Sequence, residues 1–373
     1  MTIASSINGS HAEGFITIAS GEASHAEGKS TTASGSSSHA EGNGTTASGY
    51  NSHAEGQKTI ASGEASHAEG NGYRYMPIKV TRAYTANSNT IYISFNIKNG
   101  VALVLDSNKY AIVRDCVKDT TNNDYQVTLS GSFSTDIVVN TSLTAIYTVA
   151  SGSNSHAEGN NTIASGNSAH AEGEGTTASG YNSHAEGQGT TASGVFSHSE
   201  GQGTNASSPY SHAEGYNTTA SGSGSHAEGQ GTKASGPNSH TEGYSTKASG
   251  GGSHAEGYST TAFGSNSHTE GYYTYASGSN SHAEGNNTQT TNEAEHAEGS
   301  WNLSTQSITK SSIGIGNNET NRKNAFEVTI DGSIYIKNIG NYNGTNVTDS
   351  NVKCVQEVIA EMQRFIDTYI DNH

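Results

Sequence analysis

Ser155-His156-Ala157-Glu158-Gly159 is the stretch that decides the fold of this chain. A close copy of it recurs sixteen times, always with His at the second place and Glu at the fourth. The histidines lie at His11, His25, His39, His53 and His67, and then at every fourteenth residue from His156 to His296. Between copies lies Thr-x-Ala-Ser-Gly, so the unit is TxASGxxSHAEGxx. A short fixed period repeated this often predicts a solenoid.

The composition also favours a stacked repeat over a conventional globular core. Only 31% of the 373 residues are hydrophobic, which argues against one large apolar core. Gly, Ser, Thr and Asn dominate, as they do in flexible low-complexity chains. Disorder needs no register, however, and this register holds to the residue. We therefore predict an ordered solenoid.

Charge and cysteine content limit the partners and the compartment. The net charge is −17, and sixteen of the 34 acidic residues are the repeated glutamates. Nucleic acid and anionic membranes both require a basic face, so neither a nucleic-acid partner nor membrane insertion is expected. Cys116 and Cys354 give no disulfide framework, which predicts synthesis in a reducing compartment. No signal peptide or transmembrane run is recognisable, and the opening inside a repeat predicts a longer parent protein.

Alternation along each five-residue stretch assigns its faces. In SHAEG, Ser, Ala and Gly share one side, while His and Glu share the other. In TxASG, the first Thr, Ala and Gly share one side, while x and Ser share the other. Only small residues suit the inside of so narrow a coil, so Ala and Gly are expected to face in and His and Glu to face out. The outward x varies freely, whereas His and Glu do not vary at all.

A constant outward surface requires a constant partner, and the simplest is another copy of the same chain about a shared axis. We therefore predict an oligomer whose His and Glu side chains hydrogen-bond across subunits. A coil with so little apolar surface would be marginal alone. The predicted interface residues of the repeats are His11, Glu13, His25, Glu27, His39, Glu41, His156, Glu158, His184, Glu186, His212, Glu214, His226 and Glu228.

The repeat resembles the head repeats of trimeric autotransporter adhesins (YadA-like heads) over most of residues 1–72 and 148–299. In its HAEG form it is similar to repeats of bacteriophage tail-fibre and receptor-binding proteins. The resemblance implies an all-β fold, a left-handed parallel β-roll in a tight trimer, and it is the source of trimer rather than dimer. Its motifs are specific for architecture, and the family has no catalytic residues to carry over.

The register stops after Gly72 and resumes at Thr148 without losing phase. Residues 73–147 are therefore spliced into a turn between two solenoid segments. Stretches 90–95, 101–105 and 136–139 are β-branched or apolar, which predicts a small β domain of about six strands. Long insertions in turns often carry function, so we favour a receptor-binding module over a merely stabilising bulge. Its candidate receptor contacts are Tyr84, Tyr92 and Tyr110.

The second solenoid segment, residues 148–299, carries tyrosines on one turn edge and loses its pattern at its end. The residue after HAEG is Tyr216, Tyr244, Tyr258 or Tyr272 in four coils. Such a column suits stacking on sugars or on a receptor loop. The alternative, which we favour, is that stacked aromatics shield the edge of the coil. At 289–292 the sequence Gln-Thr-Thr-Asn is expected to dissolve the TxASG strand.

Two further elements are expected after the repeats. Residues 300–349 contain a predicted hairpin in which 326–330 and 334–336 flank a two-residue type I′ turn at Asp331-Gly332. The run 322–326, together with Asp331-Gly332, resembles a segment near the C-termini of phage tail-fibre proteins. Residues 350–373 have helical spacing, which predicts a trimerising coiled coil rather than a plain amphipathic helix. Its predicted interface residues are Val352, Val355, Ile359, Met362 and Ile366.

No cofactor, metal site or catalytic residue is predicted. Imidazole and carboxylate are zinc ligands, but sites stacked about 4.8 Å apart would set divalent cations against each other. No Ser-His-Asp or paired-carboxylate arrangement stands out from the repeats. An outward x that varies among Ile, Asn, Lys, Tyr and Gln does not form the flat Thr array of an ice-binding solenoid.

The sequence therefore predicts a non-enzymatic trimeric fibre that binds a host-cell receptor, carbohydrate among the candidates, at the tail of a phage or phage-like particle. Its expected location is the virion tail, with a tail or baseplate protein expected to bind through a region N-terminal to residue 1 of this sequence. The alternative is a bacterial surface adhesin of the autotransporter type. A carbohydrate-degrading spike would need converging acids in a cleft, and the insertion shows no convincing pair.

Overall fold

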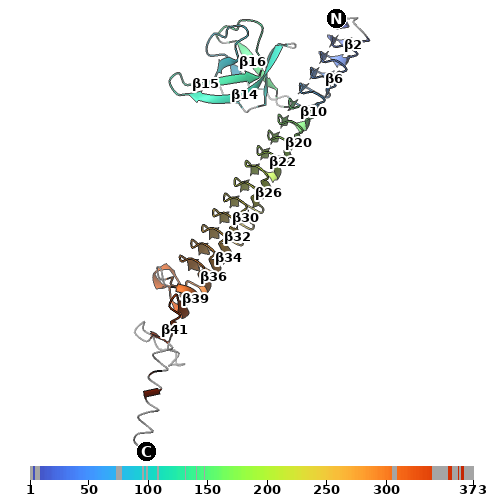
Figure 1. Cartoon of the computed structure of the whole chain (residues 1–373). Helices are drawn as coiled ribbons and strands as arrows, with labels where there is room; N and C mark the ends of the chain where they lie inside the picture. Colours follow the sequence, from blue (N-terminus) through green and yellow to red (C-terminus); the bar gives the residue numbers. More distant parts are fainter. Residues whose placement is uncertain are drawn as a thin grey trace, which may run out of the picture. The chain divides into compact units, whose positions relative to one another are not determined.

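The computed structural model describes residues 3–4, 9–72, 78–94, 96–97, 100–106, 109–130, 132–139, 141–146, 148–304, 309–337, 352–354, 360 and 363–364. They fall into two compact units, residues 1–215 and 216–373. In both units the repeats form a parallel β-solenoid (Figure 1), as predicted. Within these described ranges, no helix is long and apolar enough to cross a membrane.

Each coil contributes one strand that begins at the repeated histidine. These strands pair in parallel with the next coil in strict register, for example His25 with His39 and Gly28 with Gly42. In the first unit they are β2 (His11–Phe15), β4 (His25–Lys29), β6 (His39–Asn43), β8 (His53–Ala54), β10 (His67–Asn71), β18 (His156–Asn160), β20 (His170–Glu174), β22 (His184–Gln188), β24 (His198–Gln202) and β26 (His212–Tyr216), which ends at the division. In the second unit they are β28 (His226–Ala227), β30 (His240–Thr241), β32 (His254–Ala255), β34 (His268–Tyr272), β36 (His282–Asn286) and β38 (His296–Ser300).

The second strand of each coil is short and centres on the x-Ala pair of TxASG. These strands also stack in register, for example Thr32 on Thr46 and Ala33 on Ala47. In the first unit they are β1 (Ile3–Ala4), β3 (Ile18–Ala19), β5 (Thr32–Ala33), β7 (Thr46–Ala47), β9 (Thr59–Ala61), β17 (Thr148–Ala150), β19 (Ile163–Ala164), β21 (Thr177–Ala178), β23 (Thr191–Ala192) and β25 (Asn205–Ala206). In the second unit they are β27 (Thr219–Ala220), β29 (Lys233–Ala234), β31 (Lys247–Ala248), β33 (Thr261–Ala262), β35 (Tyr275–Ala276) and β37 (Gln289–Thr290). Gln289 and Thr290 are thus still a strand, and the prediction that the strand dissolves there was wrong.

The inside of the coil holds methyl groups and small hydroxyls, as the prediction for alanine required. Ala40 and Ala47, one from each strand of a coil, are fully buried. The buried Ser38 donates its hydroxyl to the Gly35 carbonyl at 2.7 Å, which closes the turn between the strands. Across the other turn, Thr45 Oγ1 donates to the Glu41 carbonyl at 3.1 Å. These hydroxyls satisfy backbone carbonyls in a space too narrow for larger side chains.

The glycine of HAEG does not face inward, contrary to the prediction. Gly42 is exposed and has a φ of +106°. A Cβ on Gly42 would lie 2.2 Å from the carbonyl oxygen of Gly56 in the next coil. The residue must be glycine because the backbones of neighbouring coils approach here, and not because the coil interior is narrow.

The inserted residues form an antiparallel sheet of six strands within the described part of the chain, in the order β11-β16-β13-β14-β15-β12. These are β11 (Ile78–Lys79), β12 (Thr90–Ile93), β13 (Ala102–Asp106), β14 (Lys109–Asp119), β15 (Asp124–Ser130) and β16 (Ser142–Ile146). The solenoid continues in phase across the insertion, because β10 pairs with β18 and His67 lies beside His156.

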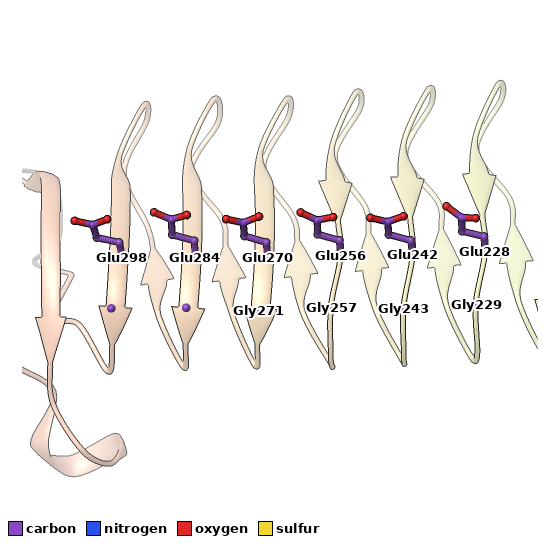
Figure 2. Close-up of a pocket in the computed structure, with 12 residues that line it drawn as sticks. Glu228, Gly229, Glu242, Gly243, Glu256, Gly257, Glu270, Gly271, Glu284 and Glu298 are labelled. Atoms are coloured by element: carbon purple, nitrogen blue, oxygen red, sulfur yellow. The ribbon is translucent and has the colours of Figure 1, made fainter.

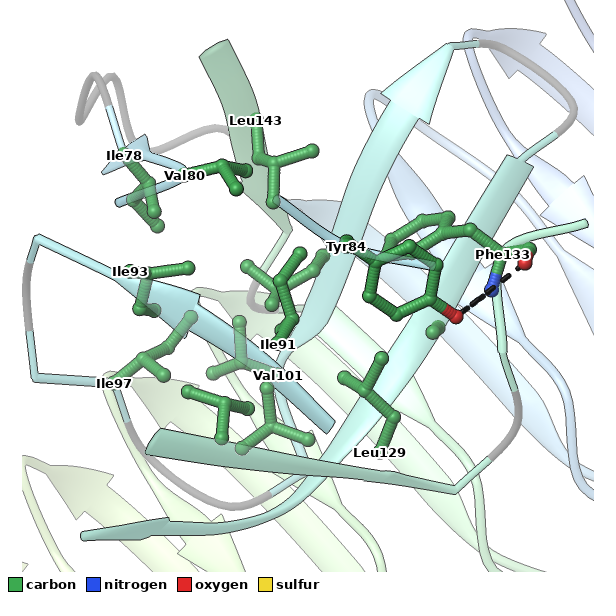
Figure 3. Packing of buried hydrophobic residues seen from close by; sticks show 14 of the residues in the cluster. Ile78, Val80, Tyr84, Ile91, Ile93, Ile97, Val101, Leu129, Phe133 and Leu143 are labelled. Atoms are coloured by element: carbon green, nitrogen blue, oxygen red, sulfur yellow. Dashed lines mark hydrogen bonds between the residues drawn. The ribbon is translucent and has the colours of Figure 1, made fainter. Parts of the chain in front are cut away.

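The insert has its own apolar core (Figure 3), whose largest fully buried side chains include Phe133, Ile91 and Leu103. Two of the three stretches that were predicted to form strands, 90–95 and 101–105, contain β12 and β13. The third, 136–139, forms only an isolated bridge between Tyr84 and Ile137, and Val138 is mostly exposed. Short β-branched stretches predict strands only where a neighbouring strand supplies the pairing.

The solenoid stack continues for one strand beyond the repeats. The next strand, β39 (Thr309–Ile315), lies parallel to β38, with Ser311 in the histidine register and Ile313 in the glutamate register. After a short 3₁₀ turn, η1 (Glu319–Asn321), the antiparallel strand β40 (Asn324–Thr329) follows. It pairs with β41 (Ile334–Lys337), which forms the expected hairpin.

The hairpin turn differs from the predicted type I′ turn. Thr329 N–H donates to the Ser333 carbonyl at 3.0 Å, which leaves a three-residue loop. Gly332 has a φ of +82°, whereas Asp331 is not in the left-handed region that a type I′ turn requires. The Asp331 carboxylate instead accepts from Thr329 Oγ1 at 2.6 Å and from Ser333 N–H at 3.0 Å. These two bonds stabilise the longer loop.

The C-terminal helix does not begin where the sequence predicted. Residues Val352–Cys354 form a strand, β42, which pairs antiparallel with β41. This stretch pairs with the free edge of β41. The helical spacing of apolar residues within 350–373 gives no information about such a distant pairing partner. Helical backbone is described at Ala360, Gln363 and Arg364. The predicted seam residues Val355, Ile359, Met362 and Ile366 lie outside the described residues.

Candidate binding surfaces

The repeated histidines and glutamates form one continuous outward surface in each unit, which we call the HAEG face. In the first unit the rings of His25 and His39 stack at 4.8 Å with an angle of 6° between their planes, and the following rings repeat this geometry. Their side chains are about one-third exposed, except at His11, where the column ends. The column arises because in-register parallel pairing places identical residues one above another.

Within the first unit a glutamate lies close to the histidine of its own coil, and in coils such as those of His39, His53 and His67 the two are outside hydrogen-bond distance. Nε2 of His39, His53 and His67 lies 3.6–3.8 Å from a carboxylate oxygen. These Nε2 atoms are shielded from solvent and have no hydrogen-bond partner in the described structure. Burial, followed by the charge of the neighbouring imidazoles, lowers the pKa of His67 and His170. Both are therefore neutral at neutral pH.

In the second unit the glutamates form a ladder, Glu228, Glu242, Glu256, Glu270, Glu284 and Glu298, along a groove of about 820 Å³ (Figure 2). Here histidines turn to the preceding coil, and His240 Nε2 lies 3.2 Å from a Glu228 oxygen. Hydrogen bonds to Glu242 and Glu270 raise the pKa of Glu256 to about 7. The hydrogen bond to Glu256 lowers the pKa of Glu242. Below pH 7, Glu256 therefore holds a proton between two neighbours, Glu242 and Glu270, whose pKa values are lowered.

Replacing Glu256 by glutamine is expected to remove a pH dependence of stability. Because the pKa of Glu256 is raised to about 7, its stabilising contribution is complete below the ordinary carboxyl pKa and is lost as the pH rises through 7. Glutamine keeps a hydrogen-bond donor at every pH. The unfolding temperature of Glu256→Gln should match wild type at pH 5 and exceed it by roughly 2 °C at pH 8, since solvent screening limits the effect.

Thermal unfolding followed by circular dichroism at both pH values measures this effect. Glu293→Gln is the matched control, because Glu293 is exposed and lies outside the ladder. It removes the same charge and should change both temperatures equally. Equal shifts for the two variants at pH 8 would contradict a shared proton in the ladder.

The HAEG face also brings together donor sets of the kind that bind metal ions. Ligand atoms of His39, Glu41 and His53 all lie within 4.8 Å of one another, and similar triplets follow along the column. Imidazole and carboxylate suit a transition-metal ion. Neighbouring triplets share a histidine, however, so occupied adjacent sites would hold divalent cations within one coil spacing. The absence of a metal site remains a prediction.

The tyrosine column, Tyr216, Tyr244, Tyr258 and Tyr272, lies exposed on one turn edge of the second unit. The rings of Tyr244 and Tyr258 stack at 4.9 Å with 7° between their planes, and Tyr258 stacks on Tyr272 at 5.1 Å. Stacked rings cover one another's faces, and the face is the part that a sugar ring would contact. The geometry therefore favours shielding of the coil edge over sugar stacking.

The three tyrosines singled out in the insert have different environments. Tyr84 is only 3% exposed, and its hydroxyl accepts from Phe133 N–H at 2.9 Å (Figure 3). It is a core residue, so its assignment as a receptor contact was wrong. Tyr92 is half-buried beneath the Arg82 guanidinium, whose carbon lies 3.8 Å from the ring centre. The Tyr110 hydroxyl is hydrogen-bonded to Ser48 and Ser62 of the solenoid.

The insert packs on the solenoid through the outward x positions of TxASG, which were predicted to vary freely. Ile60 and Val149, both at x, are buried in one cluster with Ala102 and Ile112 of the insert. Ile163, the next x, is buried in the core of the insert itself. The available signal was the run of β-branched aliphatic residues at x in the three coils that flank the insertion.

Five segments of the chain match the family model of the YadA head domain repeat: residues 26–52, 144–169, 171–197, 213–239 and 242–267. All five lie almost wholly in the solenoid segments. No curated protein matches the chain.

Proposed function

We propose that this chain, whose solenoid is built of YadA head repeats, is a fibre protein that forms a parallel homotrimer and attaches a phage or phage-like tail to a host-cell receptor. The family match supports the coarser part, an adhesin-type fibre. It equally favours a second candidate, the head of a bacterial surface adhesin. The proposal includes no catalytic step, in keeping with a structural family.

The proposal of a trimer rests on the hydrogen bonding of the HAEG face. Nε2 atoms such as those of His39 and His53 are shielded within their own chain and have no hydrogen-bond partner in its described part. Polar groups in that state normally find a partner. A turn of the partly exposed ring about its side chain would bring Nε2 to the carboxylates of a second copy of the same face, and that copy would be as constant as the face itself. The subunit interface thus consists of the histidines and glutamates named from the sequence.

The end of the column in the second unit gives independent support. Ile313 takes the glutamate register on β39 and is 37% exposed, and Ile315 on the same strand is 49% exposed. Exposed aliphatic side chains that continue a polar column fit an axis that becomes apolar toward the C-terminus. The coiled-coil seam proposed for Val355, Ile359, Met362 and Ile366 would extend the same axis.

Recognition is proposed to reside in the insert, with tail attachment through the N-terminal region. Three copies of the insert on one trimer would give avidity from a modest single-site affinity. Joining Gly72 directly to Thr148 should therefore leave a folded trimer that no longer adheres to target cells. Because Ile60, Val149 and Ile163 would lose their cover, the deletion should also replace them by Thr, the residue at x in many other coils.

Light scattering coupled to size exclusion gives the mass, and adhesion is measured on panels of bacterial strains and of animal cells. Binding to bacteria supports the tail fibre, whereas binding to animal cells supports the adhesin. The full chain carrying only the three Thr substitutions is the control for the altered surface. A monomeric mass for the full chain would contradict the proposed trimer. Undiminished adhesion of the deletion variant would place recognition outside the insert.

A further inference from the structure

A polar cleft of about 860 Å³ lies between the insert and the solenoid within the first unit. Its size falls within the range of small-molecule binding sites. The solenoid side is formed by the serines of TxASG in successive coils, and the insert side by strand β14 and the residues near Gly100 and Ser130. The serine row consists of Ser48, Ser62, Ser151, Ser165 and Ser179.

The insert contacts the serine row in two places, and the cleft lies along the rest of the row. Tyr110 engages Ser48 and Ser62. Gly100 lies so close to the solenoid that a Cβ would meet Ile163 Cγ2 at 2.3 Å. Ser151, Ser165 and Ser179 line the cleft, and their hydroxyls have no hydrogen-bond partner among the described residues. In-register stacking repeats these hydroxyls about every 4.8 Å.

A cation faces the serine row from the insert. Arg114 is the extra residue of a β-bulge, because Val113 pairs with Leu129 and Asp115 pairs with Thr128. A bulge redirects the side chain of its extra residue, and Arg114 is exposed and lines the cleft. Arg82, in contrast, is paired with Asp119 and Asp124. Among the described residues Arg114 has no carboxylate partner, although acidic residues outnumber basic ones two to one.

The geometry points to this cleft as the binding site for an acidic saccharide. A guanidinium binds a carboxylate or a phosphate through two parallel hydrogen bonds. Serine hydroxyls both donate and accept, which suits the hydroxyls of successive sugar residues along the row. The inference deepens the proposed receptor binding and rests on it, since it names the site within the insert region and the class of ligand.

The test uses the full chain on immobilised oligosaccharides that are neutral, carboxylate-bearing or phosphate-bearing. Wild type is expected to bind acidic members and not their neutral counterparts, and the two acidic groups distinguish the source of the charge. Arg114→Gln should bind at least about tenfold more weakly. Ser179→Leu, which fills the cleft from the opposite wall one coil beyond the contact at Gly100, should show a similar loss.

Lys118→Gln is the matched control, because Lys118 is exposed on the same strand and does not line the cleft. Circular dichroism and mass establish that each variant is folded and assembled. Failure of wild type to bind any acidic member, equal binding by Arg114→Gln, or equal losses for Arg114→Gln and Lys118→Gln would each overturn the site. If wild type and Arg114→Gln adhere equally to cells, the site fails while the proposed function stands. If wild type adheres to no cell at all, the proposed function fails as well.

Discussion

A chain in which His184, His198 and His212 are all replaced by Asp is expected to lose the proposed trimeric state. Each new carboxylate would lie two residues from a glutamate on the same outward face, with like charges in the coils above and below. If this face is the subunit interface, each uncompensated buried charge costs on the order of 3–5 kcal/mol. If the face is merely exposed to solvent, each costs less than about 1 kcal/mol. The two placements therefore predict clearly different results.

Mass by light scattering and the unfolding temperature together distinguish them. The control carries Ser193→Asp, Ser207→Asp and Gln230→Asp, which add the same charge at exposed positions away from the repeated histidines and glutamates. The control is expected to keep the trimer mass and nearly the wild-type unfolding temperature. An unchanged mass in the triple histidine variant would count decisively against the HAEG face as the interface.

Replacing Gly187 by Ala is expected to cause the largest loss of stability of any single substitution proposed for this chain. A Cβ on Gly187 would lie 2.1 Å from the carbonyl oxygen of Gly201 in the next coil, and the backbone φ is +101°. Neither backbone can move without breaking the parallel pairing of β22 with β24. We expect a loss of about 4 kcal/mol or more, because neighbouring coils supply most of a coil's stability.

Gly189 provides an internal control two residues away. It also has a positive φ, +66°, but a Cβ there would meet nothing within 4 Å. Gly189→Ala should cost only about 1–2 kcal/mol, the ordinary penalty of a left-handed backbone for alanine. Thermal and denaturant unfolding of both variants measure the difference. Similar losses in the two would show that conformation, and not the approach of adjacent coils, requires glycine at Gly187.

The sequence by itself determined the solenoid, because a fourteen-residue period with alanine at fixed places leaves few other ways to bury small side chains. It also determined the phase of the insertion, since the separation of 89 positions from His67 to His156 exceeds one period of 14 by the inserted 75. Alternation assigned His and Glu to the outward face, because successive strand residues point to opposite sides.

Only the tertiary structure decided what depends on contacts between distant residues. Spacing alone did not show that Ile60, Val149 and Ile163 lie under the insert, that Tyr84 belongs to its core, or that β41 recruits Val352 into a strand. The glycine of HAEG was correctly found to be constant but was placed on the wrong face. Glycine is required at this position because the backbone of the next coil lies so close. Strand alternation gives no information about that distance.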